Sequence, residues 1–221
     1  NGDSVATAFA NTVSTRTAPP PPGAPGTPSA VVSSTGALVW SWVAAADAAG
    51  YQVYLASKTA ELLAAPATNT VTLTGFGPNG LSGIVVRGLN ATAAGPLSAS
   101  ATAYTLAMPP AGLAVAWASA ASVGLSWDAN GNPAGGVYEV QLATQGAAFS
   151  SYSTYTVTAV TLQPLDSGTT YSFQVRAFNA DSVATAFSNS VATLTATPLP
   201  EAPGTPGAVV LSTGDITWTW A

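Results

Sequence analysis

The spacing closest to that of a metal-binding loop lies between residues 128 and 139. Asp128, Asn130, Asn132 and Glu139 fall at positions 1, 3, 5 and 12 of a calcium loop of the EF-hand type. Such a loop needs glycine at position 6 for its sharp turn, and this chain has Pro133 there. The flanking residues alternate as strands do, whereas an EF-hand has helices. Asn, Gly and Pro also build ordinary turns, so we expect a loop between two strands and no bound metal.

Residues that could support catalysis are scarce. The sequence has no histidine and no cysteine, and its carboxylates form no cluster in local sequence. General acid–base chemistry and nucleophilic triads usually need one of these groups. The segment GFGPNG, residues 75–80, matches G-x-G-x-x-G, but it precedes the strand-like LSGIVV where a dinucleotide site needs a helix. We therefore expect no enzyme activity and no cofactor.

The charge of the chain is low and slightly acidic. Charged residues make up 6% of the sequence, and four basic residues stand against nine acidic ones. So few cations cannot neutralise a nucleic-acid backbone, and they disfavour an anionic membrane surface. The sequence also has no apolar run of 18 residues for a transmembrane helix. The weakly charged exterior has two interpretations, a neutral extracellular surface or a surface buried against other copies of the chain.

Alternating apolar residues predict antiparallel strands, each with one buried face. In residues 170–178, for example, Tyr171 and Phe173 begin an apolar face while Arg176 lies on the other face. Asn-Gly, Ser-Gly and Gly-Gly pairs mark turns between such segments. The aromatic residues expected in the core are Trp40, Trp42, Tyr51, Trp127, Tyr138, Tyr171, Trp218 and Trp220.

Three further side chains are expected at the surface. Trp117 follows a different pattern from the other tryptophans, so we expect partial exposure, and an exposed ring can stack on a sugar or meet another copy. Arg87 and Arg176 recur in VVRG and QVRA, on the outward face of a strand. Their stems can lie over neighbouring side chains, or the two arginines can contact another subunit.

The two ends of the chain repeat one another. Residues 1–43 align without a gap on residues 179–221, with 28 of 43 positions identical. Proline-rich segments at 17–28 and 195–206 and a shorter one at 107–112 separate the units, and such segments act as semi-rigid spacers. A close copy at a fixed period indicates a tandem array. We expect each partial end either to continue covalently or to pair with a neighbouring subunit by strand donation.

On these residues each unit resembles a fibronectin type III domain, in the segments LVWSWV, GYQVY and VVRGLN and again in VGLSWD, VYEVQL and YSFQVRAFN. The resemblance implies tandem β-sandwiches of seven strands with Greek-key connections. It divides the chain into the end of one domain (1–18), domain A (19–107), domain B (108–197) and the start of another domain (198–221). It also makes Tyr171 a tyrosine corner. Ser82 holds the matching place in domain A, so the loop at 75–83 is expected to be looser or held by another contact.

The functional expectation is a bacterial extracellular structural protein, located outside the cell or at its surface, that self-associates into a fibre, stalk or filament. The alternative is a set of spacer or binding modules in an adhesin or a secreted carbohydrate-active enzyme. A receptor-like ectodomain is disfavoured because no disulfide is possible. Asn90-Ala91-Thr92 is an N-glycosylation sequon, so a glycan is a further possible partner.

Overall fold

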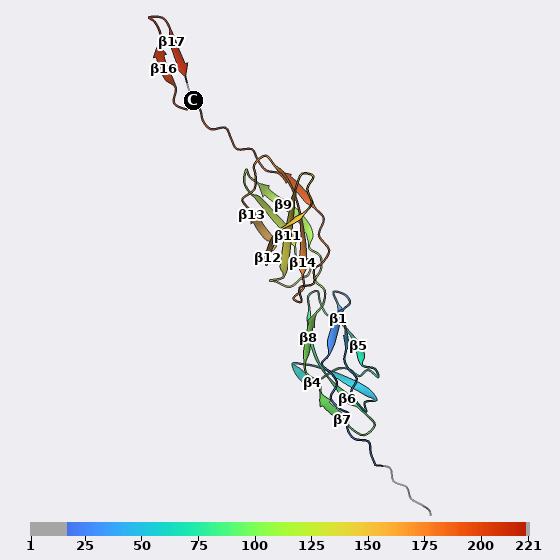
Figure 1. Ribbon diagram of the computed structural model, residues 1–221. Helices are drawn as coiled ribbons and strands as arrows, with labels where there is room; N and C mark the ends of the chain where they lie inside the picture. Colours follow the sequence, from blue (N-terminus) through green and yellow to red (C-terminus); the bar gives the residue numbers. More distant parts are fainter. Residues whose placement is uncertain (1–16, 220–221) are drawn as a thin grey trace, which may run out of the picture. The chain divides into compact units, whose positions relative to one another are not determined.

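The computed structural model describes residues 17–219, and all their regular structure is β-strand (Figure 1). Among these residues no helix is long and apolar enough to span a lipid bilayer. Contacts divide the chain into two compact units, one ending at Leu106 and one beginning at Ala107. The expected boundary placed Ala107 in domain A, but its side chain is buried in the core of the second unit.

The first unit consists of two antiparallel sheets. Strands β1 (Ser29–Val32), β2 (Ala37–Ser41) and β5 (Thr70–Thr74) form one sheet in the order β1-β2-β5. The other sheet has the order β4-β3-β6-β7, with β8 also paired to β6. Its strands are β3 (Gly50–Leu55), β4 (Lys58–Ala64), β6 (Leu81–Leu89), β7 (Ala94–Leu97) and β8 (Ala101–Tyr104). Strand β4 lies at the edge of this sheet.

The second unit repeats this arrangement. Strands β9 (Ala111–Ala118), β10 (Val123–Asp128) and β13 (Ala159–Leu162) form a sheet in the order β13-β10-β9. Strands β11 (Val137–Thr144), β12 (Ser150–Tyr155), β14 (Thr170–Phe178) and β15 (Val191–Leu194) form the other in the order β12-β11-β14-β15. The predicted fold class, all-β with tandem immunoglobulin-like sandwiches, is confirmed.

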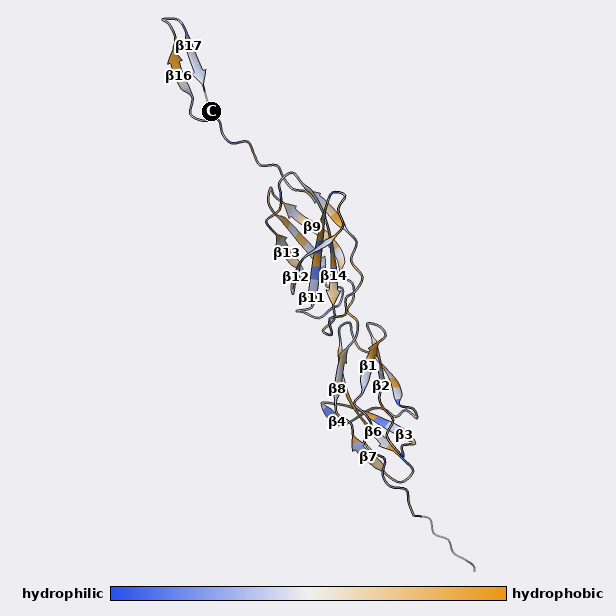
Figure 2. Ribbon diagram, in the orientation of Figure 1, coloured by the Kyte–Doolittle hydropathy of each residue, from blue (hydrophilic) through white to orange (hydrophobic). Residues whose placement is uncertain are grey.

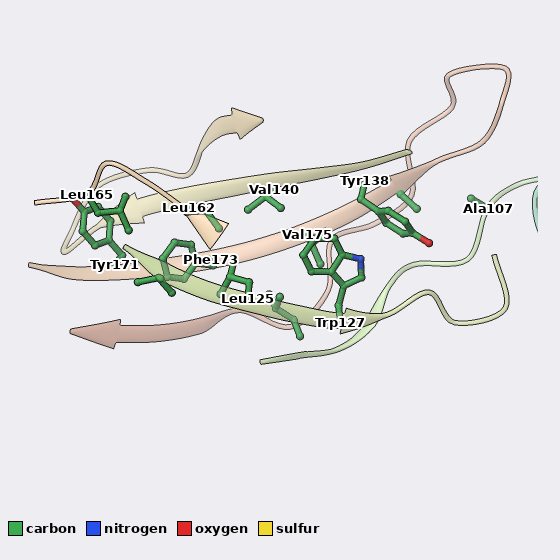
Figure 3. Close-up of a cluster of buried hydrophobic side chains, with 13 residues drawn as sticks. Ala107, Leu125, Trp127, Tyr138, Val140, Leu162, Leu165, Tyr171, Phe173 and Val175 are labelled. Carbon is green, nitrogen blue, oxygen red and sulfur yellow. The ribbon is translucent and has the colours of Figure 1, made fainter. Parts of the chain in front are cut away.

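Each unit has its own apolar core between its sheets. Burial alternates strictly along β14, so Phe173 and Val175 face inward from the middle of the strand. Figure 3 shows these side chains with Trp127 and Tyr138, whose rings meet edge to face with centroids 5.7 Å apart. Trp42 and Tyr51 form the corresponding pair in the first unit at 5.4 Å. Trp40, Trp42, Tyr51, Trp127, Tyr138 and Tyr171 are all less than 9% exposed.

A hairpin lies at the C-terminal end of the described residues, and it corrects one expectation about the core. Strands β16 (Gly207–Val210) and β17 (Ile216–Thr219) pair only with each other among the described residues. Trp218 was expected in the core but is 58% exposed, because within residues 17–219 no second sheet covers the hairpin. Figure 2 shows hydrophobic residues on β16, all of them exposed. Trp220 and residues 1–16 of the domain end expected at 1–18 lie outside the described residues.

Candidate functional site

Asn132, the fifth position of the expected calcium loop, binds the proline-rich segment that opens the second unit. Its Oδ1 accepts a hydrogen bond from the backbone N–H of Met108, and its Nδ2 donates to the carbonyl oxygen of Met108, both at 2.8 Å. Nδ2 also donates to the carbonyl of Ala129 at 2.8 Å. The side chain is 8% exposed, so these bonds are largely shielded from water. The amide therefore clamps the segment to the loop between β10 and β11.

The neighbouring residues of that loop support the clamp. The carboxylate of Asp128 accepts the backbone N–H of Asn130 at 2.6 Å, which closes a tight turn, and Asn130 has a positive φ of 55°. The side chain of Asn130 then donates to the carbonyl of Pro109 at 2.8 Å. Prolines lack an N–H, so at a proline the backbone carbonyl is the polar group by which the segment can be held.

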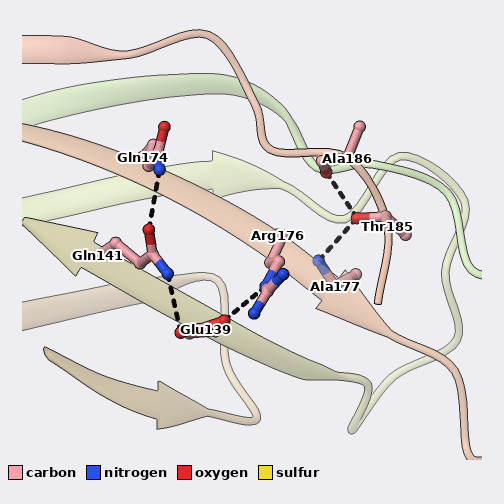
Figure 4. Close-up of polar contacts among 7 residues, drawn as sticks. All are labelled: Glu139, Gln141, Gln174, Arg176, Ala177, Thr185 and Ala186. Carbon is pink, nitrogen blue, oxygen red and sulfur yellow. Dashed lines mark hydrogen bonds and ion pairs between the residues drawn. The ribbon is translucent and has the colours of Figure 1, made fainter. Parts of the chain in front are cut away.

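Glu139, the twelfth position of the same pattern, belongs to a different set of contacts. It forms an ion pair with Arg176 on β14, and its other carboxylate oxygen accepts a bond from Gln141 at 3.1 Å. Gln174 extends the ladder by donating to Gln141 at 2.9 Å (Figure 4). Within residues 17–219 no group of three or more acidic, His or Cys side chains is placed to hold a metal ion. The four residues of the calcium pattern are thus divided between the linker clamp and this ladder.

The ion pair shifts the titration of Glu139. Burial acts to raise the pKa of its carboxyl above the ordinary 4.5, but hydrogen bonds from Gln141, Arg176 and Ser151 and the charge of Arg176 outweigh it, so the pKa is lowered. Arg176 itself contacts two aromatic rings, with its guanidinium carbon 5.2 Å from the centroid of Phe178 and 4.7 Å from that of Phe187. Cation–π contact and the ion pair together hold this side chain against its own domain.

Arg87 has the equivalent place in the first unit and also binds within its own domain. Its Nε donates to Gln52 at 2.8 Å, and an NH2 group donates to the hydroxyl of Tyr54 at 2.6 Å. The guanidinium carbon lies 5.0 Å from the centroid of the Tyr54 ring. A contact of Arg87 or Arg176 with another copy stays a prediction.

The first unit has a linker clamp of its own, built from other residues. The side chain of Asn90, after β6, donates to the carbonyl of Pro20 at 2.7 Å, and the hydroxyl of Thr92 donates to that of Pro19 at 3.0 Å. Further along the segment, the N–H groups of Gly23 and Gly26 donate to backbone carbonyls after β2 at 3.1 and 3.0 Å. The sequon asparagine therefore uses its amide to hold the linker.

Close packing of glycine supports this contact. A Cβ built on Gly88 would lie 3.2 Å from the Cβ of Pro22, and one on Gly95 would lie 3.1 Å from the carbonyl oxygen of Gly23. Larger residues at these positions would push the linker away. The related segment at 197–206, by contrast, makes no hydrogen bond to other described residues and is exposed throughout. For the linkers at 17–28 and 107–112, the clamping loops belong to the domain that follows.

Trp117 lies on the outer face of the sheet formed by β13, β10 and β9 and is 47% exposed. It pairs across the strands with Gly124, and a Cβ built on that glycine would lie 2.7 Å from Cδ1 of the indole. The ring therefore covers the backbone of Gly124. The first unit has valines, Val31 and Val39, in the corresponding pair. Because Trp117 fills the space of a missing side chain, its position has a packing explanation.

The tyrosine corner is present in the second unit. The hydroxyl of Tyr171 accepts the backbone N–H of Asp166 at 3.0 Å. Thr195 ties the same loop, because its hydroxyl accepts the N–H of Thr169 at 2.9 Å and donates to the carbonyl of Asp166 at 2.7 Å. In the first unit Thr105 makes the same two contacts, with Gly80 and Gly77 at 2.8 and 2.7 Å. The loop that lacks its tyrosine is thus held by another contact, as one of the two expectations stated.

Comparison with protein families assigns residues 108–193 to the fibronectin type III domain. The first unit has the same strand order. Residues 108–193 are therefore a fibronectin type III domain. Endoglucanase B of Cellulomonas fimi is 32% identical over 219 residues, which cover 86% of this chain and 20% of the relative. The chain therefore spans about a fifth of that relative's length.

Solved structures of fibronectin type III proteins are also similar to the chain. A two-domain segment of chicken tenascin has a TM-score of 0.47 at 15% identity. The match covers 78% of this chain and 99% of the tenascin segment. The FN1–FN3 domains of chicken CNTN1 have a TM-score of 0.40 at 18% identity. The match covers 80% of this chain and 69% of the CNTN1 chain.

Proposed function

We propose that the chain is a non-catalytic extracellular spacer that separates other parts of a longer secreted protein. The relative named as an endoglucanase supports this, since the chain matches about a fifth of it, as a spacer within a larger enzyme would. A secreted carbohydrate-active enzyme of bacterial origin is the context that we infer.

The observation that carries the proposal is the way in which each unit holds the chain that enters it. Leu106 is the last residue of the first unit, and both of its peptide groups bond there, to Ser34 at 3.1 Å and to Asn79 at 2.9 Å. The next residue, Ala107, is 3% exposed in the core of the second unit, and Asn132 clamps Met108 after it. No free residue separates these anchors. Proline-rich connections act as semi-rigid spacers, and such a restriction of the joint is what a spacer of defined length needs.

Pairs of spin labels test this restriction directly. The chain has no cysteine, so Ser57→Cys and Gln145→Cys, both at exposed positions, place one label on each unit. We expect a narrow distance distribution that widens when Asn132→Ala removes the clamp. Asn189→Ala, an exposed asparagine without a role in the linker, is the matched control and should leave the width unchanged. A broad distance distribution in the doubly labelled chain that keeps Asn132 would refute the rigid spacer.

A fibre or filament is the second candidate, favoured by the 28 identical positions shared by residues 1–43 and 179–221 and by the 6% charge content. Near-identical repeats present the same surface at regular intervals, and weak charge reduces repulsion between copies. Sedimentation over a wide range of concentration separates the two functions. A spacer stays monomeric, whereas filament formation gives growing assemblies.

A further inference from the structure

In each unit a gap lies between edge strands of the two sheets, β4 and β5 in the first unit and β12 and β13 in the second. The two units close this gap in different ways. In the second unit Tyr152 on β12 reaches across the gap, and its hydroxyl donates to the carbonyl of Gln163 at 2.8 Å and accepts its N–H at 2.9 Å. Tyr171 belongs to the buried cluster against which Tyr152 packs, and Figure 3 shows its ring beside Leu165. Two tyrosines therefore complete the packing at this side of the second sandwich.

The strand registers identify the corresponding residues of the first unit. Leu38 pairs with Leu73 as Val123 pairs with Leu162. The hydrogen bonds of Thr105 and Thr195, called here the threonine clasps, give a second correspondence. Thr105 binds Gly77 and Gly80 where Thr195 binds Asp166 and Thr169. Ala64 faces Val53 as Ser153 faces Val140. The residues that correspond to Tyr152, Leu165 and Tyr171 are therefore Leu63, Phe76 and Ser82.

Neither tyrosine is present in the first unit, and a hollow of about 350 Å³ lies there. Its wall includes Leu55, Leu63, Leu73, Phe76, Leu81 and Ser82. Phe76 is larger than its counterpart Leu165, but it does not fill the space. Ser82 is 3% exposed and lines the hollow, and Leu81 at the rim is 55% exposed. The hollow is thus an apolar site with a hydroxyl in its wall that opens at the surface.

We propose that this hollow binds a small monocyclic phenol in the place that tyrosine rings occupy in the second unit. The same fold packs phenol rings among the counterparts of Leu73 and Phe76, so the walls have the shape and polarity for such a ring. Apolar cavities of about 150 Å³ are large enough for benzene, and ligand sites commonly begin at about 300 Å³. The threonines at the rim, Thr72 and Thr74, provide hydroxyl groups near the opening.

The experiment is a titration of the full chain with p-cresol, the side chain of tyrosine as a free molecule, followed by amide chemical shifts. We expect saturable shifts confined to Leu55, Leu73, Phe76 and their neighbours. 4-Methylcyclohexanol, similar in size but not aromatic, should bind at least about tenfold more weakly, a difference of about 1.4 kcal/mol. Equal binding of both compounds, or the absence of saturable shifts, would overturn the proposal.

Variants locate the site. Ser82→Tyr restores the ring from within the chain and should abolish the shifts, while Ser190→Tyr, at an exposed position of the second unit, should leave them unchanged. Leu63→Tyr tests the opening separately if Ser82→Tyr does not fold. Unchanged binding in both pocket variants would contradict the assignment. Concentration-dependent broadening of the same amides without p-cresol would show that a second copy fills the hollow, which would also overturn it.

Discussion

Replacing Asn132 distinguishes the linker clamp from a calcium site. Asn132→Ala removes three hydrogen bonds of 2.8 Å from a side chain that is 8% exposed. A typical hydrogen bond contributes about 0.5–1.5 kcal/mol net, so the loss should lower the free energy of unfolding of the second unit by about 2–4 kcal/mol. Asn130→Ala removes one bond to Pro109 and should cost about 1 kcal/mol.

For Asn132→Asp, the linker clamp and the calcium site predict changes in stability of opposite sign. An aspartate can still accept the N–H of Met108, but it cannot donate to the carbonyls of Met108 and Ala129, so the clamp predicts destabilisation comparable to that of alanine. A calcium site would instead gain a negative ligand at this position and would be stabilised when calcium is added.

The assay is urea unfolding followed by the amide signals of β11 and β14, with the signals of β3 and β6 in the first unit as internal control. Hydrogen exchange of the Met108 amide reports the clamp itself and should accelerate in Asn132→Ala, which removes the acceptor of that amide. Unchanged exchange at Met108 together with a stability loss under about 0.5 kcal/mol would refute the argument, since surface substitutions without a structural role fall in that range.

Three further predictions follow from single contacts. Tyr171→Phe removes the bond to the N–H of Asp166 and should cost about 0.5–1.5 kcal/mol, with faster exchange in that loop; an unchanged loop would contradict the corner. Because the folded pKa of Glu139 is lowered, its stabilisation is complete above the ordinary value of 4.5 and is lost as pH falls through the lower folded pKa; Glu139→Gln should flatten this acid dependence in thermal melts, and a parallel curve would count against it. Gly124→Val should clash with the ring of Trp117 and cost about 1–3 kcal/mol, and Trp117→Val should rescue it in the double variant; a lack of rescue would show that the ring does not depend on that glycine.

Much of the fold could be predicted because strand alternation and internal repetition are strong in this chain. The alternation at 170–178 identifies the buried face of β14, and the pairing of tryptophan with tyrosine recurs in both units. The burial of Trp218 was predicted wrongly by the same alternation. Periodicity shows which side of a strand is apolar, but it cannot show whether another sheet is present to cover that side.

The linker clamp could not be predicted, because its residue types have several common uses. Asn132 fits a turn and a calcium loop equally well by spacing, and Asn90 fits a sequon. What distinguishes these uses is the partner of each amide, and here the partners are proline-segment carbonyls 24 and 70 residues away in sequence. Only the closed sandwich brings the loops and the segment together.

The different solutions in the two units suggest how such repeats diverge while the fold is kept. The threonine clasp, with Thr105 and Thr195, is present in both, so the loop before β6 or β14 stays anchored when the tyrosine is absent. Once one contact suffices to hold the loop, the residue at the tyrosine position is free to change. The first unit has Ser82 and Phe76 where the second unit has Tyr171 and Leu165. Redundant anchoring is therefore what permits the hollow in the first unit. The same reasoning requires that Thr105→Val disturb its loop more than Thr195→Val, because only the second loop retains a tyrosine bond.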